Sequence, residues 1–248
     1  MRKLLVFQHV PLEPLGTLNR QFKDAGFRIR YVNFDREPNV RVDPARYHGL
    51  VVLGGPMAAN QTDHYPHLAY EQDVIVRAAG LGLPVLGICL GAQLIAAAFG
   101  GRILRRAAPE YGWVAVRPTA AGRDDDLIGQ FANEDPVYQW HSDTFTLPHA
   151  AVHLAESDGC RLQAFRLQDH IYGFQFHLEA DRHLIERWIQ APRLADELKV
   201  HGIKLDHAAT LAASDRLLPR ASRLGQAVFG EFINRFYRFR RRHAHVSR

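Results

Sequence analysis

The pattern of apolar and polar positions in the first hundred residues alternates between two kinds of segment. Short strand-like runs end at glycine or polar residues, and stretches with helical spacing separate them. The runs at residues 4–10, 50–53 and 84–88 are apolar, and the run at 27–34 alternates apolar and polar side chains; the helical stretches cover residues 14–25, 68–80 and 91–99. Continuous apolar strands that alternate with helices are typical of a parallel sheet covered on both faces. We therefore expect an α/β fold for this part.

The second half of the chain has a different pattern. Strand-like runs with short turns cover residues 113–117, 137–145, 151–155, 160–166 and 171–176, and a helix is expected near 182–189. Beyond Pro192 the chain reads as helical to its end. Its apolar residues there form one stripe at steps of three and four: Val228, Phe229, Phe232, Ile233, Phe236 and Tyr237. We predict a main domain over residues 1–190 and a helical extension over 191–248, which packs on that domain or mediates homo-oligomerisation.

Length and composition fit this division. The chain has 248 residues, of which 47% are hydrophobic and 23% charged, the balance of a protein with an ordinary core. Its first apolar run breaks at Gln8-His9, so it is too short for a secretory signal or a membrane span. We expect a cytoplasmic protein with no membrane partner.

Positive charge is concentrated at the C-terminus. The net charge is +5, and residues 235–248 contain six arginines and no acid, so the rest is near neutral. A nucleic-acid-binding surface is therefore not expected over the bulk of the chain. An alternative for the tail is that residues 238–242 form a docking site for an anionic partner or nucleic acid.

Cys89 is the candidate nucleophile. Gly87-Ile88-Cys89-Leu90-Gly91 places it between an apolar strand and a helix of small residues. Flanking glycines allow a strained turn without a Cβ clash, and this turn lifts the side chain clear of the sheet, as in the G-x-S-x-G turn of hydrolases. The N-terminus of the following helix favours the thiolate and offers N–H groups to an oxyanion. Cys160 has no such frame and is expected to be a buried structural cysteine.

A candidate base follows the last predicted strand. Fourteen histidines are present, so position matters more than presence. His177 and Glu179 end the apolar run that begins at Ile171, and residues two apart in an extended segment point to the same side. A carboxylate there can orient an imidazole that serves a cysteine. No histidine pair has cysteines or carboxylates at zinc-like spacing, so we expect neither a metal nor another cofactor.

Several motifs together resemble the class I glutamine amidotransferases. They are, in chain order, Gly54-Gly55-Pro56-Met57, Gly87-Ile88-Cys89-Leu90-Gly91-Ala92-Gln93, Trp140-His141-Ser142-Asp143, Gln163-Ala164-Phe165 and Gly173-Phe174-Gln175-Phe176-His177-Leu178-Glu179. The resemblance covers about residues 4–187 and is strongest to stand-alone relatives of the amidotransferase half of GMP synthase. It implies a doubly wound, flavodoxin-like α/β fold with a mostly parallel sheet and helices on both faces.

The resemblance also implies roles for individual residues. Cys89 would form a γ-glutamyl thioester, His177 would act as base and then acid, and Glu179 would orient it. The backbone N–H groups of Gly55 and Leu90 would stabilise the oxyanion. Gln93 would contact the glutamine, and His141, Ser142 and Asp143 would border the amino-acid end of the substrate. One departure is visible, because Leu178 stands where the family usually has proline.

Three functions are compatible with these residues. The first is a glutaminase that releases ammonia for an acceptor synthase on another chain, since neither an ATP-pyrophosphatase loop nor a Walker motif occurs in the 248 residues. The second is a γ-glutamyl peptidase acting on small γ-glutamyl compounds. The third is a non-catalytic binding module, which the intact set of cysteine, histidine and glutamate disfavours.

Overall fold

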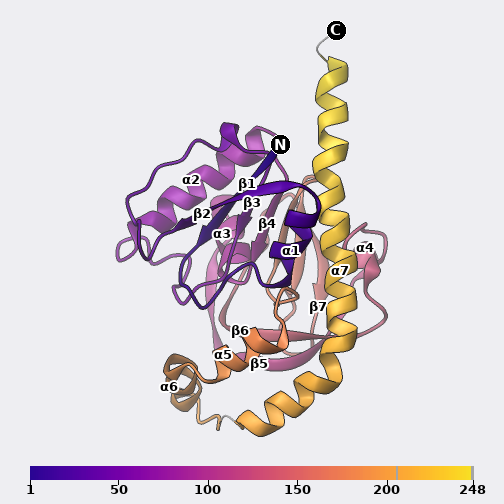
Figure 1. Cartoon of the computed structure of the whole chain (residues 1–248). Helices are drawn as coiled ribbons and strands as arrows, with labels where there is room; N and C mark the ends of the chain where they lie inside the picture. Colours follow the sequence, from indigo (N-terminus) through magenta and orange to yellow (C-terminus); the bar gives the residue numbers. More distant parts are fainter. Residues whose placement is uncertain (205, 247–248) are drawn as a thin grey trace.

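The computed structural model describes residues 1–204 and 206–246, and side chains up to residue 238. Within these residues, nine strands form one sheet in the order β2-β1-β3-β4-β9-β8-β7-β5-β6 (Figure 1). The sheet has a parallel half and an antiparallel half that share the strand β9.

The parallel half contains the continuous apolar runs of the sequence. Its strands are β1 (Arg2–Gln8), β2 (Phe27–Asn33), β3 (Leu50–Val52), β4 (Val85–Ile88) and β9 (Ile171–Phe174). Each adjacent pair is parallel, with Val51 opposite Leu86 and Gly87 opposite Gly173. Because parallel strands end at the same edge, the loops after β1, β3, β4 and β9 are brought together.

The antiparallel half contains the strand-rich second half of the sequence. Its strands are β5 (Ile103–Pro118), β6 (Asp135–Phe145), β7 (Ala151–Glu156) and β8 (Ala164–Leu167). The β5 strand begins ten residues before the predicted run, because the first part of β5 mixes apolar and charged side chains without alternation and lies mostly at the surface, where no apolar pattern is required. Its long pairing with β6 has an irregularity between Arg105 and Glu110.

Helices cover both faces of the sheet, as expected. The helices α2 (Pro66–Gly80) and α3 (Leu90–Ala98) bury their apolar sides against Leu5, Phe7 and Val52 on one face. On the other face, α1 (Thr17–Asp24) and the C-terminal helix α7 (His207–Val246) pack on Leu4, Val6 and Val51. Three short elements lie in the connecting loops: the 3₁₀ turn Pro44–Arg46 before β3, the helix α4 (Ala120–Arg123) after β5, and the 3₁₀ turn Ile128–Gln130 before β6.

The C-terminal region contains three helices. The first two are α5 (Arg182–Ile189), at the predicted bounds, and α6 (Pro192–Val200), and the long helix α7 then runs along one side of the molecule (Figure 1). Phe236 on α7 makes edge-on ring contacts with Phe22 and Phe27, at centroid distances of 5.7 and 4.9 Å. The apolar stripe therefore packs on the main domain through its buried members.

The basic tail is described only in part. Arg238 contacts the carboxylate of Asp126 at 2.7 Å, whereas the side chains of residues 239–242, on which the docking alternative rests, lie outside the described residues. Among the described residues, no helix combines the length and apolar character that crossing a membrane requires.

Candidate active site

Cys89 lies in the turn between β4 and α3. Its φ of 53° is in the left-handed region, which is unusual for a residue with a Cβ. Cys89 is held there by its backbone N–H, which donates to the carbonyl of Phe174 on β9 at 2.8 Å. Backbone strain of this kind, fixed by the surrounding structure, often marks a functional residue.

The flanking glycines avoid a Cβ clash, as expected. Neither Gly87 nor Gly91 has a positive φ, so the strained residue is Cys89 itself. A Cβ on Gly87 would lie 2.4 Å from the backbone of Gly91, and a Cβ on Gly91 would lie 2.0 Å from the carbonyl oxygen of Val52. The glycines are therefore required by the close packing of the α3 N-terminus on β3 and β4.

His177 and Glu179 come together after β9. The Nδ1 atom of His177 lies 2.6 Å from Oε1 of Glu179, and both side chains are buried. The thiol of Cys89 donates to the backbone oxygen of Trp140 at 3.6 Å, and its electrostatics are coupled to those of His177. The structure thus brings the three residues together in the order that nucleophile, base and orienting group require.

The electrostatic environment of the two reacting groups follows from this contact. Burial opposes the charged form of His177, but the negative charge of Glu179 and the contact with Cys89 outweigh it and raise the pKa of His177 well above its usual value. Burial raises the pKa of the Cys89 thiol, and hydrogen bonding to His177 acts against this rise. The protonation of Cys89 and that of His177 therefore depend on each other, and Glu179 favours the protonated form of His177.

Packing holds the segment that carries His177 and Glu179. Leu178, in place of the usual proline, is buried in the same apolar cluster as Leu224 and Val228 of α7. The ring of Trp188 on α5 meets the imidazole of His177 edge-on at a centroid distance of 4.9 Å. The rigidity that proline would give is therefore replaced by contacts with the C-terminal helices.

The loop after β3 places Gly55 beside Cys89. His9 lies behind this loop, with Nδ1 2.9 Å from the carbonyl oxygen of Gly54 and Nε2 3.0 Å from Glu71. Because the peptide is trans, the N–H of Gly55 points away from the carbonyl that His9 holds. Gly55 itself lines the pocket that contains Cys89.

His9 is itself held by a buried polar chain. His9 and Glu71 have no solvent exposure, and His67 adds a contact of 2.9 Å from Nδ1 to the other oxygen of Glu71. Burial works against protonation of His9, but the carboxylate of Glu71 outweighs it and raises the pKa of His9. Both partners of His9 are acceptors, which suits an imidazolium that donates from both nitrogens.

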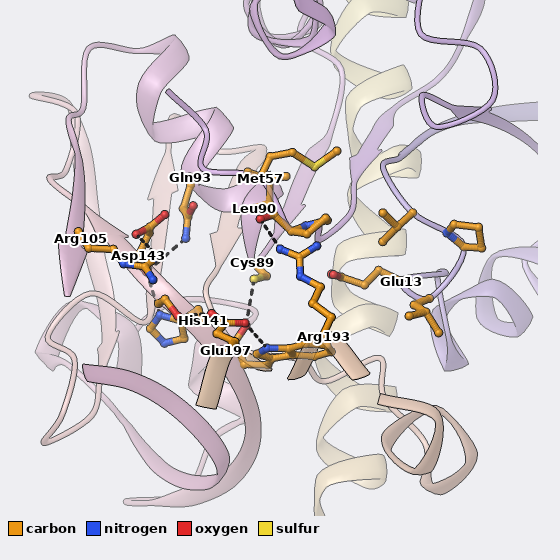
Figure 2. Close-up of a pocket in the computed structure, with 17 residues that line it drawn as sticks. Glu13, Met57, Cys89, Leu90, Gln93, Arg105, His141, Asp143, Arg193 and Glu197 are labelled. Carbon is orange, nitrogen blue, oxygen red and sulfur yellow. Dashed lines mark hydrogen bonds and ion pairs between the residues drawn. The ribbon is translucent and has the colours of Figure 1, made fainter. Parts of the chain in front are cut away.

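A cavity of about 320 Å³ opens beside Cys89 (Figure 2). This volume falls at the small end of the range for small-molecule sites. In the view of Figure 2, Gln93, Asp143 and Arg105 lie on one side of Cys89, and Glu13 and Arg193 lie on the other. Leu90, from the N-terminus of α3, lines the cavity next to the sulfur, and its backbone N–H hydrogen-bonds to the Cys89 side chain.

The residues expected at the amino-acid end of a substrate line one part of this cavity. Gln93 donates from Nε2 to the backbone oxygen of Asp143 at 3.3 Å and to Oε1 of Gln175 at 3.2 Å. The carboxylate of Asp143 pairs with Arg105 at 3.1 Å. Both amide hydrogens of Gln93 are thus used within the protein, and Gln93 is fixed against β6 as it lines the cavity.

Both ring nitrogens of His141 are hydrogen-bonded within the protein. Nε2 lies 2.9 Å from Glu110 and Nδ1 lies 2.9 Å from the backbone oxygen of Asp143. Among the described residues, Glu110, His141 and Cys160 have potential ligand atoms within 4.8 Å of one another. Glu110 also accepts hydrogen bonds from Ser157 and Gln163, so these polar groups satisfy one another and brace β5 against β6.

Four charged residues of the pocket were not predicted from the sequence: Glu13, Arg105, Arg193 and Glu197. Glu13 follows β1, and its Oε2 lies so close to Gly54 that a Cβ there would be 1.7 Å away. Burial raises the pKa of Glu13. Arg193 and Glu197 come from α6, in the predicted extension, and both line the cavity. Isolated charges in a loop and on a short helix form no motif, so no sequence signal marked them.

Comparison with known proteins gives consistent results. The class I glutamine amidotransferase family model matches residues 15–187. The chain is 32% identical over 185 residues to YfeJ, a glutamine amidotransferase-like protein of Salmonella typhimurium, covering 73% of this chain and 77% of that protein. It is 35% identical over 164 residues to one subunit of the glutamine-hydrolysing GMP synthase of Natronomonas pharaonis, covering 65% of this chain and 79% of that protein.

Solved structures agree with the fold. A glutamine amidotransferase from Thermotoga maritima superposes with a TM-score of 0.83 and 29% identity, over 94% of this chain and 98% of that one. The doubly wound fold with a C-terminal helix is therefore confirmed, and it extends over nearly the whole chain. The chain belongs to the class I glutamine amidotransferase family.

Proposed function

We propose that this protein hydrolyses the γ-amide of glutamine through a thioester on Cys89 and releases ammonia for an acceptor synthase on another chain. The contact of Cys89 with His177, and of His177 with Glu179 at 2.6 Å, carries this proposal. An acceptor in trans is supported by similarity to a protein that is named as one subunit of a glutamine-hydrolysing GMP synthase.

The reaction follows from the positions of these groups. The sulfur of Cys89, its proton passed to His177, attacks the γ-carbonyl carbon, and the N–H groups of Gly55 and Leu90 stabilise the negative oxygen. His177 then gives the proton to the leaving nitrogen, the C–N bond breaks, and ammonia departs. Water attacks the thioester with His177 as base, which releases glutamate and restores the thiol.

Glu179 has a supporting part in this sequence. Its carboxylate fixes the ring orientation of His177 and stabilises the imidazolium that forms during each proton transfer. Gln93, Ser142 and Asp143 would border the amino-acid end of the substrate, where they line the cavity. No step calls for a metal or an organic cofactor.

A second candidate is hydrolysis of small γ-glutamyl compounds. The cavity continues past Cys89 to Glu13 and Arg193, on the side away from Gln93. A group larger than ammonia on the γ-nitrogen would lie in this part. The same triad would cleave either substrate, so the leaving group distinguishes the two activities.

Turnover measurements test both candidates. The full-length chain should release ammonia from glutamine, and Cys89→Ala should abolish release while Cys160→Ala retains it. Parallel assays with γ-glutamyl dipeptides decide between the candidates by comparison of kcat/KM. Release of neither ammonia nor amino acid, with or without cell lysate to supply a partner, would contradict the proposal.

A further inference from the structure

The helix α6 closes one wall of the pocket, although it belongs to the predicted extension. Near its start, Arg193 donates from Nη2 to the backbone oxygen of Pro56 at 2.7 Å. One turn later, Glu197 accepts from Nε1 of Trp140 at 3.1 Å and from the hydroxyl of Ser142. Residues four apart lie on the same side of a helix, so one face of α6 joins the loop after β3 to strand β6.

The carboxylate of Glu197 has a fixed position but no counter-charge from the protein. Its two hydrogen-bond donors, an indole N–H and a hydroxyl, are neutral. Within residues 1–204 and 206–238, no arginine, lysine or histidine forms an ion pair with it. A negative charge held in place at a cavity wall favours a cationic group on the ligand.

Two other carboxylates line the same cavity, and each is less suited to that group. Asp143 is neutralised by Arg105 at 3.1 Å. Glu13 lies on the side of Cys89 opposite Gln93, where the leaving group would be (Figure 2). Glu197 contacts Ser142, next to the residues that would border the amino-acid end of the substrate.

We propose that Glu197 binds the α-ammonium group of the γ-glutamyl substrate and makes a free α-amino group a condition for tight binding. This assignment rests on the proposed function for the identity of the substrate. The extension then supplies part of the binding site, and substrates that keep the γ-amide and the carboxylate but lack the amino group are rejected. Glu197 touches the substrate away from the reacting atoms, so it sets specificity.

This proposal is tested by comparing the binding of glutamine and of an analogue without the amino group to the Cys89→Ala variant, which cannot react. Glutaramate has the γ-amide and the carboxylate of glutamine but no amino group. Calorimetry on Cys89→Ala should give a dissociation constant for glutamine at least about 30-fold lower than for glutaramate. Adding Glu197→Gln, which keeps the shape and a hydrogen-bond acceptor, should bring the two constants to within about threefold by weakening glutamine alone.

Matched variants separate the possible results. Asp196→Asn, the adjacent exposed position on α6, should leave the preference unchanged, and a thermal melt of each variant shows that it is folded. A preference that survives Glu197→Gln, or that collapses with Asp143→Asn instead, overturns the assignment. Equal binding of both ligands to Cys89→Ala also overturns it. An intact Glu197-dependent preference in a chain that releases no ammonia would contradict the proposed hydrolysis and leave this inference standing.

Discussion

The nucleophile and the base of the proposed triad are held in different ways. Cys89 lies in a turn whose backbone packs directly on the backbone of β3. A Cβ on Gly91 would lie 2.0 Å from the carbonyl oxygen of Val52. The segment with His177 and Glu179 is irregular, and its Leu178 packs against the side chains of α7. Backbone contact leaves no room to adjust, whereas side-chain packing can give by small shifts. The nucleophile side should therefore tolerate less change than the base side.

The largest effect is expected at the nucleophile turn. Gly91→Ala should reduce ammonia release by more than about 100-fold and lower the free energy of unfolding by about 3 kcal/mol, because the new methyl group meets the backbone of β3. Gly80→Ala is the matched control, since nothing lies within 4 Å of a Cβ at that helical glycine. Comparable activity and melting temperature for the two variants would contradict the account of the turn.

The next effect concerns the group that orients the base. Glu179→Gln should lower kcat/KM by about 100-fold and alter the pH profile. Glu179 raises the pKa of His177, so its removal lowers that pKa. At low pH both Cys89 and His177 are protonated, and attack requires this pair to lose one of its two protons. Activity therefore rises with pH, and in the variant the rise should occur at lower pH with a lower plateau. A pH–rate profile of unchanged midpoint would argue against the role of Glu179.

A smaller effect is expected at His9, which lies behind the loop after β3. His9→Gln removes the charged link between Gly54 and Glu71, so the Gly55 N–H should lose its fixed direction. We expect kcat to fall about tenfold with little change in KM, because the donor acts mainly on the transition state. His64→Gln, at an exposed position, should have no effect. An unchanged kcat in folded His9→Gln would show that the loop holds its own geometry.

The smallest effect is expected where α7 supports the base segment. A Cβ on Gly225 would lie 2.8 Å from the backbone oxygen of Leu178, whereas nothing lies within 4 Å of a Cβ on Gly230. Gly225→Ala should lower the unfolding free energy by about 1 kcal/mol and reduce activity a few-fold. Gly230→Ala, in the same helix, should raise the unfolding free energy by about 0.5–1 kcal/mol. If denaturant titrations gave the same change in unfolding free energy for both variants, the proposal that α7 supports Leu178 would be contradicted.

The sequence predicted the features that depend on neighbouring residues. The strand-to-helix turn at Cys89 is contained in five consecutive residues, and the pairing of His177 with Glu179 follows from their spacing of two. The expectation that the glycines avoid a Cβ clash is supported, but the motif could not show which atoms they avoid, because Val52, which Gly91 approaches, lies on a strand distant in the sequence.

Long-range features could not be predicted in this way. Arg193 and Glu197 reach the pocket only because α6 folds back over the loop after β3 and over β6. The first part of β5 carries no strand pattern because most of it lies at the surface, which imposes none. In both cases the position of a residue is set by tertiary packing, which a local pattern of apolar residues does not record.

The central claim is that Cys89 forms a γ-glutamyl thioester, and trapping tests it most directly. The full chain would be treated with 6-diazo-5-oxo-L-norleucine, an electrophilic analogue of glutamine, and digested for mass spectrometry. The account predicts one adduct, on Cys89, whose formation slows as free glutamine is added, with Cys160 unmodified. Modification of Cys160 instead, or labelling of Cys89 that glutamine does not slow, would contradict it.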